Sequence, residues 1–72
     1  MSTNGAIQIV INGESRSVTH GHTILQLLET LALDPARVAV ELDRRIVKPV
    51  DWPATALAEG AHLEIVQFVG GG

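Results

Sequence analysis

Residues 63–72 read Leu63-Glu64-Ile65-Val66-Gln67-Phe68-Val69-Gly70-Gly71-Gly72. The first seven are mostly apolar, which is typical of a β-strand, and three glycines follow. Glycine has no Cβ and loses more conformational freedom on ordering than any other residue, so packing gains little from three in a row. Fully extended, three residues reach roughly 10 Å. We therefore interpret Gly72 as the working end of the chain and the residues before it as its support.

An alternative is that these glycines are only a frayed terminus or the remainder of an expression tag. The strand before them favours the first interpretation, because a terminal strand tied into a sheet anchors whatever follows it. This strand is also the most continuously apolar one in the sequence, so we expect it to lie inside a sheet with a neighbour on each side.

Composition limits the classes of function. Seventy-two residues suggest one domain, residues 1–72. A net charge of −3 and only two aromatic residues, Trp52 and Phe68, argue against nucleic acid as the ligand. The lack of cysteine excludes disulfides, thiolate catalysis and cysteine zinc sites. We see no long apolar run and no charged-then-apolar leader, so we expect a cytoplasmic protein with no membrane segment.

A hairpin and a helix are predicted in the first half of the chain. Ala6–Ile11 is rich in β-branched residues, Asn12-Gly13 is a strong hairpin signal, and residues 15–19 form the returning strand. Thr23 and Gln26 have the spacing of a helix capping box. The apolar stripe of this helix consists of Ile24, Leu27, Leu28 and Leu31. We expect the helix to run for about ten residues, or ~15 Å, and to end at Asp34-Pro35.

The second half is predicted to hold three strands and one long connection. Val38–Leu42 and residues 46–47 are strands around a turn at residues 43–45, and Pro49 ends the second of them. In the connection over residues 50–60, we expect Asp51 to cap a helical turn near Trp52 and residues 54–58 to hold another turn. The last strand covers residues 62–69. The order predicts an α+β domain with about five strands and one helix on one face of a single sheet.

The last strand has two rows of side chains, and a single helix can cover only one of them. The sequence does not decide which row faces out, but Leu63 and Ile65 are the better core candidates, which leaves Val66 and Phe68 on the other row. We interpret Val66 and Phe68 as an exposed apolar patch where a partner docks. The alternative is that the loop around Trp52 covers them.

Other candidate sites are weaker. His20 and His22 have a spacing that could bind metal, but no further ligand is close in sequence, so we predict a solvated turn and no metal site. His62 is expected at the surface. Arg44, Arg45 and Lys48 form a small basic group, either a solvated hairpin tip or a surface that steers an acidic partner. We find no catalytic triad and no phosphate-binding loop, so the remaining reactive group is the terminal carboxylate, which needs prior activation, for instance as a mixed anhydride with AMP.

The residues from Glu64 to Gly72 closely resemble the ending of the sulfur carrier family of thiamine biosynthesis (ThiS). Val40-Glu41-Leu42, Ile46-Val47 and Trp52 resemble that family's middle region, and the resemblance covers nearly the whole chain after Gly5. It implies a ubiquitin-like β-grasp fold, with an about five-stranded mixed sheet packed on one helix, and a flexible glycine tail at residues 70–72.

The resemblance also implies a function. An ATP- and Mg-dependent adenylyltransferase similar to ubiquitin-activating enzymes would adenylate Gly72. A separate persulfide donor would convert it to a thiocarboxylate, and a thiazole synthase would receive the sulfur. Gly70 and Gly71 would thread the partner's channel, and Val66 and Phe68 would dock. The chain itself would be a protein co-substrate without cofactor, and not an enzyme.

Two alternatives remain at this stage. One is another carrier of the same fold, such as the small subunit of molybdopterin synthase, or a ubiquitin-like modifier, for which Lys48 is the only lysine in the sequence. The other is a β-grasp binding module with an inert tail.

Overall fold

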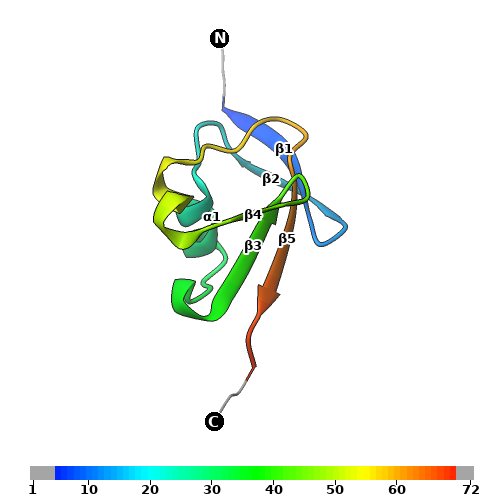
Figure 1. The fold of residues 1–72 in the computed structure, drawn as a ribbon. Coiled ribbons are helices and arrows are strands. Elements are labelled where there is room, and N and C mark those ends of the chain that lie inside the picture. Colours follow the sequence, from blue (N-terminus) through cyan, green and yellow to red (C-terminus); the bar gives the residue numbers. More distant parts are fainter. Residues whose placement is uncertain (1–4, 70–72) are drawn as a thin grey trace.

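A computed structural model describes residues 5–69 as one mixed sheet with a helix on it (Figure 1). The elements in chain order are β1 (Ala6–Ile11), β2 (Glu14–Thr19), α1 (Ile24–Thr30), η1 (Pro35–Arg37), β3 (Val38–Leu42), β4 (Arg45–Val47), η2 (Pro49–Ala54) and β5 (His62–Gln67), where η denotes a 3₁₀ helix. The five strands are ordered β2-β1-β5-β3-β4. Only the β1–β5 pair is parallel. The predicted fold class is confirmed, and so is the central place of the last strand.

The β1–β2 hairpin turns at Asn12-Gly13, as predicted. Their φ angles are 50° and 86°, the left-handed backbone that a two-residue hairpin turn requires. The strands pair from Ala6 opposite Thr19 to Ile11 opposite Glu14, so β2 begins one residue before the predicted strand.

Helix α1 begins where the capping box predicts. The N–H of Gln26 donates to Thr23 Oγ1 at 3.2 Å, and the N–H of Thr23 donates to Gln26 Oε1 at 2.9 Å. These two bonds satisfy backbone groups that the first turn leaves without partners. Ile24, Leu27 and Leu28 are fully buried against the sheet.

The predicted end of α1 is wrong. The helix ends at Thr30, because Ala32 takes a left-handed φ of 59°. The N–H of Ala32 donates to the carbonyl of Glu29 at 3.0 Å and that of Leu33 to the carbonyl of Leu28 at 2.9 Å, which is a Schellman ending. The usual sequence signal for this ending is a glycine, and here the position holds alanine. Asp34 instead caps η1, where its Oδ1 accepts from the N–H of Ala36 at 2.9 Å.

The connection after β4 also differs from the prediction. A 3₁₀ helix, η2, surrounds Trp52, but Asp51 lies inside its first turn and does not cap it. Residues 54–58 form no second turn. Ala56 instead makes a β-bridge with Thr23, which ties the connection to the start of α1.

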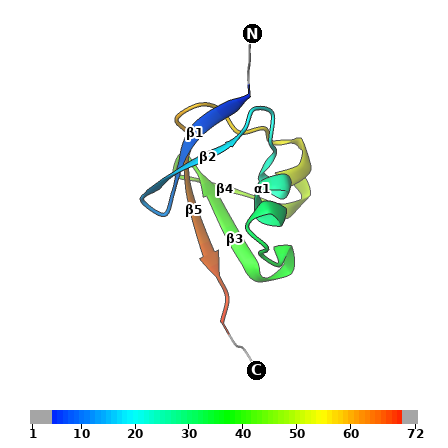
Figure 2. The ribbon, with the colours of Figure 1, turned by 180° about the vertical axis from the view of Figure 1, so that it is seen from behind.

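The core lies between α1, η2 and one face of the sheet. Trp52 is 1% exposed, and its indole N–H donates to the carbonyl of Val47 at 2.9 Å, so its one polar atom is satisfied. Figures 1 and 2 show α1 and η2 together on one side of the sheet. The other side of β3 and β5 carries no helix, and the functional candidates lie there.

Candidate functional site

The sheet holds β5 along both edges at its start and along one edge at its end. On one side, β5 pairs with β3 from Leu63 opposite Leu42 to Gln67 opposite Val38. The N–H of Phe68 then donates to the carbonyl of Arg37 at 2.7 Å. Val69 follows with 91% of its surface exposed. The backbone of the described chain is therefore anchored as far as Phe68, and it leaves the fold at Val69.

The two rows of β5 are divided as the sequence suggested. Leu63 and Ile65 are buried, at 1% and 9% exposed, whereas Val66 and Phe68 are 57% and 55% exposed. The alternative in which the loop around Trp52 covers Val66 and Phe68 is wrong, since Trp52 is buried in the core under the opposite face of the sheet. Whether Val66 and Phe68 bind a partner stays a prediction.

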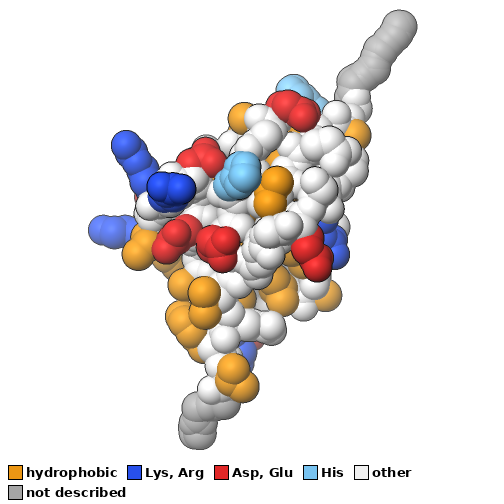
Figure 3. Space-filling model, turned by 90° about the vertical axis from the view of Figure 1, so that its right-hand side faces the viewer, with side chains coloured by type: hydrophobic (Ala, Val, Ile, Leu, Met, Phe, Trp, Pro, Cys, Tyr) orange, Lys and Arg blue, Asp and Glu red, His pale blue; other side chains and the backbone are white. Residues whose placement is uncertain are grey.

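These two side chains belong to a larger apolar surface. Ala39 is opposite Val66 in the β3–β5 register, and Ile46 on β4 is 76% exposed. A shallow hollow of about 80 Å³ lies here, with Ala39, Ile46 and Val66 in its lining. We name Ala39, Ile46, Val66 and Phe68 the outer patch. Figure 3 shows apolar side chains gathered toward the end where the chain leaves the fold.

The exposure of Ile46 was not predicted from the sequence. Residue 46 stands in a predicted strand, where isoleucine is typical of a core. The register places it opposite Glu41, whose side chain is exposed, and therefore on the outer face. Only the pairing of β3 with β4 reveals this placement.

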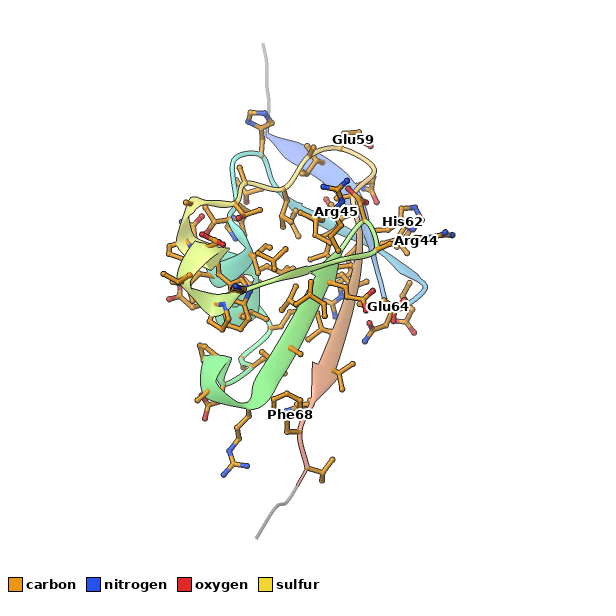
Figure 4. The ribbon with its side chains drawn as sticks, in the orientation of Figure 1. Arg44, Arg45, Glu59, His62, Glu64 and Phe68 are labelled. Carbon is orange, nitrogen blue, oxygen red and sulfur yellow. The ribbon has the colours of Figure 1, made fainter. Side chains whose placement is uncertain are left out.

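Charged residues border the outer patch. Glu41 and Glu64 are directly opposite each other in the β3–β5 register, and both are exposed. Figure 4 shows Arg44, Arg45 and His62 near the start of β5, and Phe68 past its end. Within residues 5–69, the one ion pair is between Arg37 and Asp34 at 3.9 Å, so neither glutamate of the opposed pair takes part in one.

His20 and His22 lie in the segment between β2 and α1. His22 Nε2 lies 3.3 Å from Thr30 Oγ1, and His20 is exposed in the same turn. In the part of the chain that the structure describes, no three His, Cys, Asp or Glu residues are grouped to hold a metal ion. None of the helices described there is long and apolar enough to cross a membrane.

The sequence and fold match known proteins. The sequence model of the ThiS family matches residues 9–72, which include Gly70, Gly71 and Gly72. The chain belongs to the ThiS family. The resemblance noted from the sequence is thereby confirmed. The three glycines themselves lie outside the described residues.

Two curated relatives of this ThiS-family chain are similar over 66 residues. They are a thiazole synthase of Paramagnetospirillum magneticum at 41% identity and a thiazole synthase of Magnetococcus marinus at 36%. Each alignment covers 92% of this chain. The chain spans only about a fifth (20%) of the length of these relatives.

Solved structures are similar to this chain over most of its length. The crystal structure of the thiamine biosynthesis protein ThiS from Geobacter metallireducens has a TM-score of 0.79 at 26% identity, covering 92% of this chain and 100% of that one. A solution structure of a thiamine biosynthesis protein from the same organism has a TM-score of 0.77 at 28% identity, covering 92% and 88%. A designed protein based on ubiquitin, at 15% identity and a TM-score of 0.56 with 96% and 98% covered, shares the fold alone.

Proposed function

We propose that this chain carries sulfur as a thiocarboxylate on Gly72 and donates it for thiazole formation in thiamine biosynthesis. The observation that carries the proposal is the ThiS family match over residues 9–72, because it extends through the three glycines. The chain acts as a protein co-substrate, and the catalytic groups and the ATP with its Mg²⁺ belong to a partner enzyme.

The reaction needs three steps, which start from the Gly72 carboxylate. First, a carboxylate oxygen attacks the α-phosphorus of ATP and pyrophosphate leaves, which produces an acyl adenylate. A persulfide sulfur then attacks the acyl carbon, and AMP leaves with the electron pair of the broken C–O bond. The product is an acyl disulfide. A thiol attacks its outer sulfur and breaks the S–S bond, leaving the thiocarboxylate and a new disulfide.

The fold supports this chemistry by the way in which it presents the end of β5 to a partner enzyme. Backbone pairing anchors β5 as far as Phe68, and the outer patch lies directly beside the exit. We infer that the outer patch docks on an adenylyltransferase similar to ubiquitin-activating enzymes, through Val66 and Phe68. Gly70 and Gly71 then thread the partner's channel, since residues without side chains enter where bulkier ones do not.

A thiazole synthase is the proposed acceptor of the sulfur. Support comes from the two curated relatives, each named thiazole synthase, whose sequences contain a segment similar to this chain. A sulfur carrier must meet its acceptor in every reaction cycle. A carrier-like segment within the sequence of a thiazole synthase is consistent with this.

Removal of Gly71 and Gly72 tests the proposal. The truncated chain keeps the outer patch, so it should still compete with the full chain for the cognate adenylyltransferase. It should release no pyrophosphate from ATP, because the new terminus ends short of the active centre. A truncated chain that is adenylated as fast as the full chain would show that Gly72 is not the acceptor.

A further inference from the structure

Two hairpin turns hold β5, and each uses a side chain to do so. At the β1–β2 turn, the N–H of Ile65 donates to Asn12 Oδ1 at 2.8 Å, and Asn12 Nδ2 donates to the carbonyl of Ile65 at 3.1 Å. At the β3–β4 turn, the N–H of His62 donates to Asp43 Oδ1 at 3.0 Å, and the N–H of Asp43 donates to the carbonyl of His62 at 2.8 Å.

The Asn12 side chain replaces missing rungs of the parallel ladder. The N–H of Val10 donates to the carbonyl of Ala61, and that of Asn12 donates to the carbonyl of Leu63, both at 2.9 Å. A parallel strand that continued would next accept from Ile65 with the carbonyl of residue 12, and donate to Ile65 with the N–H of residue 14. The chain turns away at Asn12-Gly13, so both partners are lost. A carboxamide has both an acceptor oxygen and a donor NH₂ group, so it replaces both.

Asp43 replaces only one missing group. In the antiparallel β3–β5 ladder, residue 43 would exchange two bonds with residue 62. The backbone N–H of Asp43 still supplies its half, so only an acceptor is missing, and a carboxylate oxygen suffices. The choice of amide at one turn and acid at the other therefore follows from which backbone groups the turn removes.

The bonds of Asn12 matter most where β5 leaves the fold. Pairing with β1 ends at Leu63, whereas pairing with β3 continues to Gln67. Beyond Leu63, the edge of β5 that faces β1 is held by Asn12 alone among the hydrogen bonds of residues 5–69. Ile65, which Asn12 holds, directly precedes Val66 of the outer patch. A strand bonded along one edge can turn about that edge, and a bond on the second edge prevents it.

We propose that Asn12 is a positioning residue, which fixes the direction in which β5 presents Val66, Phe68 and the glycines after them to the adenylating partner. This inference rests on the proposed function. Without the Asn12 side chain, the partner must itself order the end of β5 when it docks. Once the carrier has docked, it presents Gly72 as the wild-type chain does. Loss of the Asn12 side chain therefore raises KM for the carrier and leaves kcat unchanged.

The test exchanges the side chains of residues 12 and 43, and a further variant removes the side chain of Asn12. Asn12→Asp keeps an acceptor but places an anion against the carbonyl of Ile65, and Asn12→Gly removes both bonds. Both substitutions suit the positive φ of 50° at this position. With the cognate adenylyltransferase and ATP, pyrophosphate release should show KM for the carrier raised by about five- to tenfold, the equivalent of one net hydrogen bond, with kcat unchanged. In Asn12→Gly, hydrogen exchange of the Ile65 amide should accelerate.

Asp43→Asn is the matched control. It lies in the same kind of turn with the same φ of 50°, and its amide still supplies the acceptor that His62 needs, so KM should stay at the wild-type value. All variants are assayed below the onset of their thermal unfolding. An Asn12→Gly protein with faster Ile65 exchange and unchanged KM would overturn the positioning role. Failure of the wild-type chain to release pyrophosphate would instead count against the proposed function.

Discussion

At the scale of single residues, Ala32 is the least expected one in the fold. It ends α1 with a φ of 59°, where its Cβ is too close to the following carbonyl oxygen. Glycine avoids this strain but loses more entropy on folding. We predict that Ala32→Gly raises the free energy of unfolding by about 1 kcal/mol, since the strain of 1–2 kcal/mol exceeds the entropic cost. Urea unfolding followed by circular dichroism measures the change.

The control for this substitution is Ala36→Gly. Ala36 lies in η1 and is not among the residues with positive φ, so glycine there should stabilise nothing. An equal effect of the two substitutions would mean that the left-handed backbone of Ala32 carries no strain.

Single residues also show what a sequence can and cannot predict. Asn12-Gly13 predicted the hairpin turn correctly, because positive φ is a local property. The bonds from Asn12 to Ile65 span 53 positions, and nothing local indicates them. The end of α1 was missed for a related reason, since Ala32 gives no sign of the conformation that the packing of Leu33 and the capping bonds impose on it.

At the scale of elements, the outer face of β5 should decide docking. We predict that Phe68→Ser raises KM for the carrier by roughly tenfold or more and leaves kcat unchanged, because loss of one aromatic anchor weakens an interface by about 1–2 kcal/mol or more. The free energy of unfolding should change little, since Phe68 is already 55% exposed. Pyrophosphate release at varied carrier concentration measures both constants.

Val50→Ser provides the comparison. Val50 is 79% exposed, but it lies on η2, away from the outer patch. Its replacement should leave KM unchanged. Equal KM values for Phe68→Ser and wild type would remove the outer patch from the docking surface.

The opposed glutamates of β3 and β5 give a prediction about stability. Like charges directly opposite in a sheet repel, and Glu41 and Glu64 have no ion pair within residues 5–69. Glu64→Gln should raise the free energy of unfolding by about 0.2–1 kcal/mol at low salt, and the gain should shrink as salt screens the repulsion. Glu14→Gln removes a charge opposite Ile11 and serves as the control. A gain that is the same for both, or the same at high salt, would exclude the cross-strand repulsion.

The elements themselves were mostly predictable. Alternating β-branched residues, the capping box of Thr23 and the apolar stripe of α1 predicted the strands and the start of the helix. The conformation of the connection over residues 50–60 was not predictable, because it follows from tertiary contacts. The burial of Trp52 and the bridge of Ala56 to Thr23 shape this segment, and local propensity does not.

At the scale of the whole molecule, the folded domain supports β5, and the proposed chemistry takes place on Gly72. A core under one face of the sheet holds β5 in place, and the outer patch on the opposite face is exposed beside the point where the chain leaves the fold. From the sequence, the alternation of β5 and the presence of one helix predicted one exposed row but did not decide which; Val66 and Phe68 were favoured because Leu63 and Ile65 are the better core candidates. The sequence could not predict that Ile46 extends this surface, because that requires the register of β4.

The central claim is that Gly72 becomes a thiocarboxylate, and intact mass spectrometry tests it most directly. The chain is incubated with its cognate adenylyltransferase, ATP, a persulfide donor and a thiol, and a parallel reaction omits ATP. We predict an ATP-dependent mass increase equal to the replacement of one oxygen by sulfur, which fragmentation assigns to Gly72. An unchanged mass with an enzyme of verified activity, or sulfur on any other residue, would contradict the claim.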